Sequence, residues 1–124
     1  MEDNRYLYQV ANKFIRDEEE SLCRLLEIIG YENINSDLDG SNLKISAYKY
    51  DILQITIRIG VTGIIADMIN FFVIINAKRR IFPSDIQEIE IQQSTNIGHN
   101  DWDKLDRLAS DMISHVSHYK WFEQ

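Results

Sequence analysis

The fold is decided by residues 53–60, which read Leu53-Gln-Ile-Thr-Ile-Arg-Ile-Gly60. A large aliphatic residue stands at every odd position, and a polar residue or glycine stands at every even one. This period of two is typical of a β-strand with one buried face. Residues 43–48 alternate in the same way, so we predict that the two segments pair as a hairpin with its turn near Tyr50-Asp51. The turn lacks an Asn-Gly or Asp-Gly pair, so the register stays open.

The next segment, residues 64–77, is apolar at nearly every position. A run of this length fits a buried helix, a loop followed by a strand, or a short helix followed by a strand. The aromatic and β-branched residues 71–75 favour a strand in its second half. Isoleucines at positions 86, 89 and 91 predict a further, more polar strand.

The C-terminal segment has the spacing of an amphipathic helix. Its apolar residues, separated by three or four positions, are Trp102, Leu105, Leu108, Ala109, Met112, Ile113, Val116 and Tyr119. Asn100 is a candidate N-cap, and Asp101 and Asp103 suit the positive end of the helix dipole. We predict a helix of about five turns here.

Residues 6–29 also have helical spacing, and Gly30 is a natural stop. Four consecutive acids, Asp17 to Glu20, interrupt the pattern and cannot share one solvent face at about 100° per residue. Glu18 stands four residues from both Phe14 and Leu22. Either Glu18 lies at the margin of the buried stripe, or the helix breaks and restarts with Asp17 as its N-cap.

Together these elements predict a single α+β domain over residues 1–124. We expect an N-terminal helix, continuous or broken near Asp17, then three to four mostly antiparallel strands, then a C-terminal helix packed on one sheet face. Pro83 is the single proline, and no repeat or flexible linker divides the chain.

The composition limits the partners. Twenty acidic residues against thirteen basic ones give a formal charge of −7, which opposes nucleic acid and favours a basic protein partner or none. Cys23 is the single cysteine, which excludes an intramolecular disulfide and a zinc site with two thiolates. The N-terminus lacks the pattern of a signal peptide, and no apolar run is long enough for a bilayer. We therefore expect a cytoplasmic protein with no membrane partner.

The best metal candidate is Asp111, His115 and His118, because steps of four and three residues bring three ligand side chains onto one helical stripe. A ladder of alternating charge on a solvated face is the favoured interpretation, since Asp103, Arg107, Asp111 and His115 recur every four residues. We therefore predict no cofactor, and a small metal-dependent enzyme remains an alternative.

Other motifs are weaker. Residues 35–40 resemble the first half of a calcium-binding EF-hand loop, but Asn42 and Ser46 stand where the second half needs an apolar residue and a glutamate, so we predict a solvated loop. The cationic run 78–80 is interpreted as a solvated turn, and Cys23 as a small buried hydrophobe. Glycine-rich phosphate loops and nucleophile elbows are absent from the sequence, so we predict no catalytic residue and a protein that is not an enzyme.

The faces of the sheet are more informative. Two helices cover roughly one face, so one of the two alternating apolar sets in residues 71–75 needs another cover. An exposed set would mark a dimer or partner interface, whereas residues 61–67 or the C-terminal tail are alternative covers. The candidate dimer interface is Phe71, Val73 and Ile75.

These features favour a small acidic protein-binding module that occludes a partner surface, as inhibitors do. Small acidic immunity proteins and antitoxins are similar in size and charge, and an acidic dimeric secretion-type chaperone is the alternative within the same class. The candidate partner-binding residues are Asp17, Glu18, Glu19, Glu20, Tyr48, Arg58, Asp101, Asp103, Asp106, Trp121 and Phe122.

Overall fold

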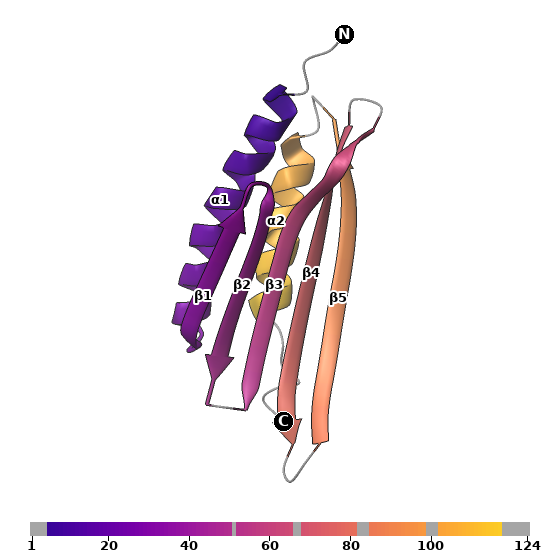
Figure 1. The fold of residues 1–124 in the computed structure, drawn as a ribbon. Coiled ribbons are helices and arrows are strands. Elements are labelled where there is room, and N and C mark those ends of the chain that lie inside the picture. The colour runs from indigo at the N-terminus through magenta and orange to yellow at the C-terminus, as the bar shows by residue number, and fades with distance from the viewer. Residues whose placement is uncertain (1–4, 51, 66–67, 82–84, 99–101, 118–124) are drawn as a thin grey trace.

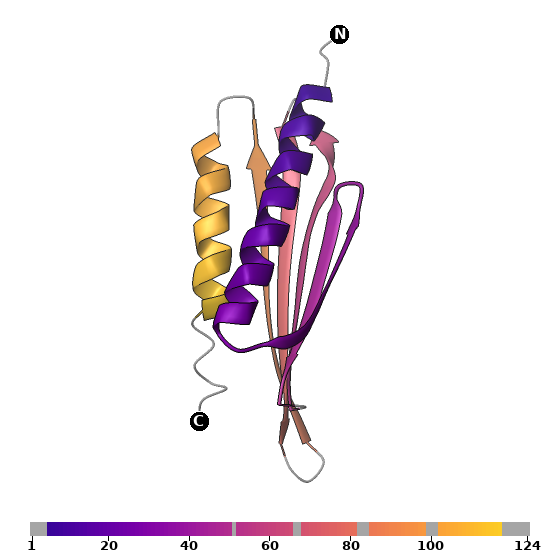
Figure 2. The ribbon, with the colours of Figure 1, turned by 90° about the vertical axis from the view of Figure 1, so that its left-hand side faces the viewer.

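The computed structural model describes residues 5–50, 52–65, 68–81, 85–98 and 102–117. Its elements are α1 (Arg5–Ile28), β1 (Glu32–Asp39), β2 (Asn42–Lys49), β3 (Leu53–Ile65), β4 (Met68–Ile81), β5 (Asp85–Ile97) and α2 (Trp102–Ser117). The strands form one antiparallel sheet in the order β1-β2-β3-β4-β5, and both helices lie against the same face of it (Figures 1 and 2). The predicted α+β class is confirmed, but the sheet has five strands instead of three or four.

The additional strand is β1. Residues 35–39, predicted to be part of a loop, pair with β2 through Asp37↔Lys44 and Asp39↔Asn42. Asp, Asn and Ser are common turn formers, but pairing with β2 gives their backbone groups the hydrogen bonds that a loop would take from water. Gly40 has a φ of +62°, which suits the tight turn between the two strands.

Residues 64–65 belong to the end of β3, and residues 68–77 belong to β4. The β3–β4 register runs from Leu53↔Arg79 to Ile65↔Met68, with one shift between Val61 and Gly63. The helical alternatives for this segment are therefore wrong. The cationic run 78–80 is also part of β4 and not a turn, so alternation places its members on two different faces.

The core lies between the two helices and one face of the sheet. Ile45, Ile57 and Ile75 form a row across β2, β3 and β4 and are fully buried. Burying an aliphatic side chain of this size stabilises the fold by about 1.5–3 kcal/mol. Such rows under the helices form a single apolar layer.

The predicted dimer interface lies in this layer. Phe71, Val73 and Ile75 are buried, and the Phe71 ring meets the Phe14 ring of α1 edge to face, with 5.6 Å between centroids. The prediction that these three residues form an interface is wrong, because the helices already cover them. Phe72 and Ile74 point to the opposite face.

Helix α1 is continuous and does not break near Asp17. Glu18 lies inside its buried stripe, with Ile15 and Leu22 buried before and after it, and only 7% of Glu18 is exposed. The apolar residues on both sides hold the helix against the sheet through this position. Neither described helix is long and apolar enough to cross a membrane.

The end of α1 follows the prediction at Gly30, which has a φ of +100°. The Tyr31 N–H donates to the Leu26 carbonyl at 2.9 Å, and the Gly30 N–H donates to the Glu27 carbonyl at 3.1 Å. This is the paired hydrogen bonding of a Schellman motif. The Lys49 Nζ of β2 also donates to the Ile29 carbonyl at 3.0 Å, which ties the helix end to the sheet.

Candidate functional site

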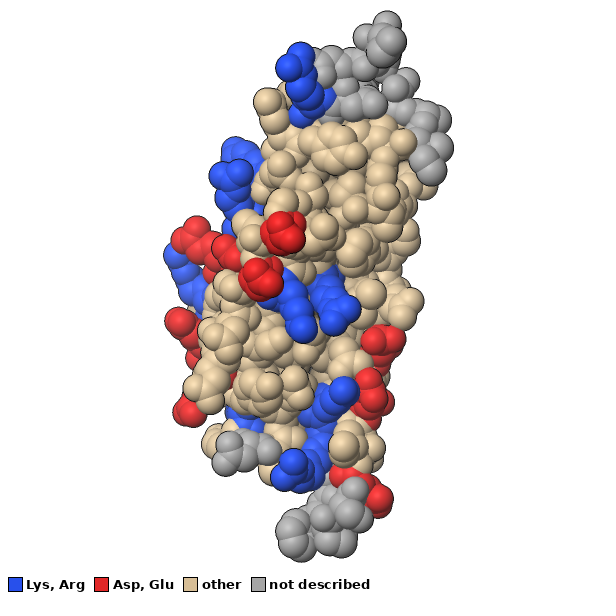
Figure 3. Space-filling view, viewed as in Figure 1, with Lys and Arg blue, Asp and Glu red and all other residues tan. Residues whose placement is uncertain are grey.

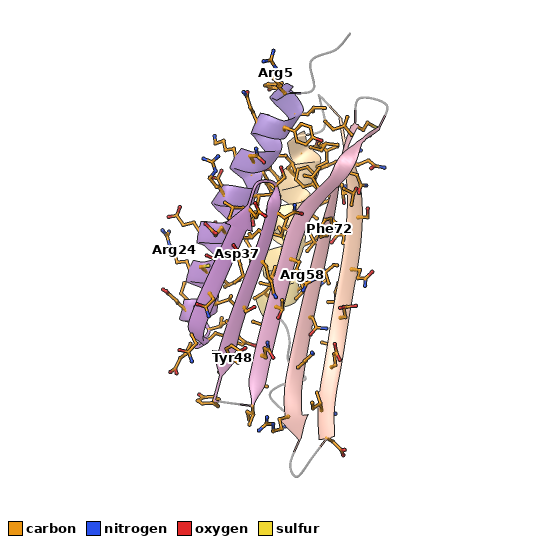
Figure 4. The ribbon with its side chains drawn as sticks, in the orientation of Figure 1. Arg5, Arg24, Asp37, Tyr48, Arg58 and Phe72 are labelled. Atoms are coloured by element: carbon orange, nitrogen blue, oxygen red, sulfur yellow. The ribbon has the colours of Figure 1, made fainter. Side chains whose placement is uncertain are left out.

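The candidate site is the face of the sheet turned away from the helices, which we call the open face. No described element covers it (Figures 1 and 2). The strand register brings one residue from each strand into a row, and one such row reads Asp37–Lys44–Arg58–Ile74–Gln92. Two of the predicted partner-binding residues, Tyr48 and Arg58, lie on this face and are exposed, and 40% of Tyr48 is accessible. Figure 4 shows Tyr48, Arg58, Phe72 and Asp37 on four neighbouring strands.

Basic side chains occupy the centre of the open face. Lys44 and Arg58 stand directly opposite each other on β2 and β3, a like-charge pairing that destabilises a sheet. Neither forms a hydrogen bond or an ion pair with its side chain within the described part of the chain. Figure 3 shows blue in the middle of the face, with red directly beside it and further red toward both flanks. Asp37 of β1 stands opposite Lys44 on its other side and offsets part of this charge, whereas the two cross-strand neighbours of Arg58, Lys44 and Ile74, carry no carboxylate.

Two adjoining hollows mark the same region. One has a volume of about 470 Å³ and is bordered by Asp37, Lys44, Arg58, Phe72 and Ile74, among others. The other has a volume of about 260 Å³ and shares Arg58 and Ile74 with the first. Arg58 and Ile74 therefore stand between two depressions that follow β3 and β4.

Phe72 depends on Gly60, its cross-strand partner on β3. A Cβ atom on Gly60 would come within 2.5 Å of both the Phe72 Cζ atom and the Asn42 Oδ1 atom. The Phe72 ring therefore lies over bare backbone, and it borders the larger hollow. Glycine in a strand interior often marks such a close approach.

We expect Gly60→Ala to displace the Phe72 ring and the Asn42 side chain, because the new methyl group needs their space. Both clashing atoms are the far ends of side chains that can rotate, so the free energy of unfolding should fall by only about 1 kcal/mol. Amide and ring NMR shifts and urea unfolding measure the two effects. Thr56→Ala, on the same face and strand, is the control; equal shift changes at Phe72 in both variants would contradict this account.

The acidic candidates on α1 are divided between surface and core. Glu20 is exposed and pairs with Arg24 at 2.6 Å. Asp17, Glu19 and Glu20 border a shallow groove of about 620 Å³ between α1 and β1. Glu18 is buried, so its assignment as a partner-binding residue is wrong: its side chain is not accessible to a second molecule.

The remaining partner-binding candidates are on or near α2. Asp103 and Asp106 are exposed on that helix. Asp101, Trp121 and Phe122 lie outside the described residues.

The metal candidates do not form a cluster among the described residues. The Asp111 carboxylate accepts a hydrogen bond from Gln93 of β5 at 3.2 Å, and His115 is half-buried on the same helix. His118 lies outside the described residues. No group of three His, Cys, Asp or Glu side chains suited to a metal occurs in the described part of the chain.

Cys23 is half-buried beside the α1–β1 groove. Burial raises the pKa of its thiol, and the negative charge of Glu19 adds to this increase. A hydrogen bond with Ser36 acts in the opposite direction and is the smaller influence. The thiol is therefore held in its protonated form, which is a poor nucleophile.

The fold and the open face together define a class: a five-stranded antiparallel meander with helices on one face and a hollowed, charged surface on the other. Comparison with protein-family models, curated protein sequences and solved structures gives no match for this chain.

Proposed function

We propose that this chain is a protein-binding module that holds its partner against the open face. The observation that carries this proposal is the direct opposition of Lys44 and Arg58 beside the half-buried side chains of Phe72 and Ile74. Two cations side by side cost stability in the free protein, and Asp37, opposite Lys44, offsets only part of that cost. A carboxylate from a partner would remove that repulsion, so the arrangement favours the bound state.

The side-chain types agree with this proposal. Arginine and tyrosine are among the residues that most often dominate binding energy in protein interfaces, and both occur here as Arg58 and Tyr48. Phe72 and Ile74 add apolar area next to the charge. The partner contact we expect is therefore an acidic group flanked by apolar side chains.

Occlusion of a partner surface, as in an inhibitor or immunity protein, and chaperone-like binding of an extended segment both use such a face. The metal-dependent enzyme is the weaker proposal, because the Asp111 carboxylate is already engaged by Gln93.

A basic partner is a second candidate, and the α1–β1 groove supports it. Its border includes Asp17, Glu19, Glu20 and Glu27, although Arg16 and Arg24 also lie there and offset part of the charge. Electrostatic steering by this groove would be sensitive to salt.

The experiment is capture of a partner by the tagged chain from its native cells at low salt, followed by affinity measurements with surface variants. We expect Arg58→Glu to weaken binding at least about tenfold, as loss of a central interface arginine commonly does. Arg16→Glu makes the same charge change on α1 and should leave the affinity nearly unchanged.

Two outcomes would contradict the open-face proposal. One is a partner that binds Arg58→Glu as well as the wild type. The other is a partner lost only when Glu19 and Glu20 are both changed to lysine, which would place the contact in the α1–β1 groove. Binding affinities of the same variants at increasing salt concentration measure how much of the binding free energy of each contact is electrostatic.

A further inference from the structure

We infer that β5 is a self-association edge through which two copies of this chain join into one ten-stranded sheet. This inference does not rest on the proposed function, because backbone pairing at the outer edge of β5 carries it, although the Gln92 side chain used in its test lies on the open face. It commits to a second copy of the chain as the occupant.

The first observation is the regularity of β5. All thirteen of its residues pair with β4 without a register shift, from Asp85↔Ile81 to Ile97↔Ile69. Within the described part of the chain, no strand pairs with its outer side. Every second residue of such an edge directs its N–H and C=O outward, which makes a template for another strand.

The opposite edge is different. Strand β1 has only eight residues, and its pairing with β2 shifts between Glu32 and Asn35. Asn33 has a φ of +52°, which bends the strand away from regular geometry. Short and irregular edges resist further pairing. Strand β5 has no bulge, no proline and no basic residue to protect it in the same way.

The second observation is the sequence of β5, which is divided into two complementary halves. Its first half carries Asp85, Glu88 and Glu90, and its second half, residues 92–96, contains only amide and hydroxyl side chains. Two antiparallel copies in full overlap have their symmetry axis at Ile91. Glu90 then lies opposite Gln92 of the second copy, and Glu88 lies opposite Ser94. Each carboxylate thus faces an amide or hydroxyl group instead of a second carboxylate, although Gln92 and Ser94 also donate within their own chain, to Glu90 and Asn70.

Two β5 strands could also pair over fewer residues, with the symmetry axis shifted from Ile91 toward the N-terminal half, but these pairings are less favourable. An axis at Glu90 places the two Glu90 side chains opposite each other, and an axis at Ile89 places Glu88 opposite Glu90 twice. Like charges at directly opposed positions destabilise a sheet. The charge pattern therefore disfavours these two overlaps, and the full overlap centred on Ile91 pairs the most backbone.

The third observation is incomplete cover of β5 on the helix side. Strand β5 is about 44 Å long, whereas α2 spans about 24 Å and lies along its C-terminal half (Figure 2). Ile89, on the helix side, is consequently 37% exposed. In the symmetric pairing, Ile89 lies opposite Gln93 of the second copy, the residue that hydrogen-bonds to α2. The α2 helix of the second copy would then lie beside Ile89.

The test is sedimentation equilibrium from low to high micromolar concentration with two opposite changes at one position. Gln92→Glu places a second carboxylate opposite Glu90 in both symmetric contacts, and we expect it to weaken the dimer roughly five- to tenfold. Gln92→Lys places a cation there and should strengthen the dimer by a similar factor.

Gln54→Glu is the matched control, because it makes the same chemical change on the open face of β3, away from the edge. It should leave the dimer constant unchanged. A wild-type chain that stays monomeric over the whole range would overturn the inference. So would a dimer that responds to Gln54→Glu as strongly as to Gln92→Glu, since that result would place the contact on the open face, which carries both residues, and not at the β5 edge.

Discussion

Phe71→Ala is expected to lower the free energy of unfolding by about 3–5 kcal/mol, the usual cost of removing a buried aromatic side chain. Phe71 is 1% exposed and packs on Phe14 of α1. Its removal leaves a cavity between helix and sheet that the surrounding side chains fill only in part. A loss of this size is a large share of the total stability of a small domain.

The neighbouring residue provides the control. Phe72→Ala removes an identical side chain from the open face, where the ring is half-exposed, and should cost only about 1 kcal/mol or less. Urea unfolding of both variants measures the difference through the midpoint, provided that the slope is unchanged. Equal losses would contradict the assignment of the two faces. We further expect only Phe72→Ala to weaken partner binding while the fold is retained.

Glu18→Met is expected to raise the free energy of unfolding at neutral pH by about 1–3 kcal/mol, because a buried carboxyl oxygen without a hydrogen-bond partner is costly. Glu18 is the one charged residue that is buried in the described part of the chain. Its Oε2 atom has no hydrogen-bond partner. Methionine has a similar length and shape and removes the polar group without overfilling the site.

The stability gained by Glu18→Met should increase as the pH rises. Burial raises the pKa of Glu18 above its usual range, and the charge of Asp17 adds to this increase. The native state therefore binds this proton more tightly than the unfolded state, so the contribution of Glu18 to stability falls as pH rises from its ordinary pKa to the raised one. Above the raised pKa, the full penalty of the buried charge is present.

The measurement is urea unfolding of wild type and Glu18→Met from about pH 4 to about pH 8, and the quantity of interest is the difference between the two proteins at each pH. This difference should be smallest at acidic pH and increase toward neutral pH. Glu20→Met removes an exposed acid from the same helix, and its effect should stay within about 0.5 kcal/mol. A destabilised Glu18→Met variant would contradict the account of Glu18 as an unsatisfied group.

Part of the candidate site was predictable from the sequence. The alternation of residues 53–60 identifies the strand that carries Arg58 and assigns Arg58 to the face opposite the isoleucines. Tyr48 follows from the same pattern on β2. Lys44, Phe72 and Ile74 were missed as site residues, although each of them alternates with buried neighbours in its strand, as Arg58 does. Their importance depends on cross-strand register, which the sequence did not define.

Two other differences have related causes. Residues 35–39 were predicted to form a loop because Asp, Asn and Ser favour turns, yet β2 offers them a complete set of backbone partners. Glu18 was predicted to lie at a margin or a helix break, yet the apolar residues around it keep α1 continuous. In both cases, packing with distant segments overrides a local preference.

The sequence by itself determined how often apolar residues recur along each segment: about every two residues in the strands and about every 3.6 residues in the helices. It also determined that the first helix ends at Gly30. These periods follow from local backbone geometry, which depends on neighbouring residues alone. Only the tertiary structure decided which face of β4 is covered, because Phe71 and Phe72 are equally apolar and alternation does not distinguish inside from outside. That choice depends on where α1 and α2 dock, since their apolar stripes can bury only one face of the sheet.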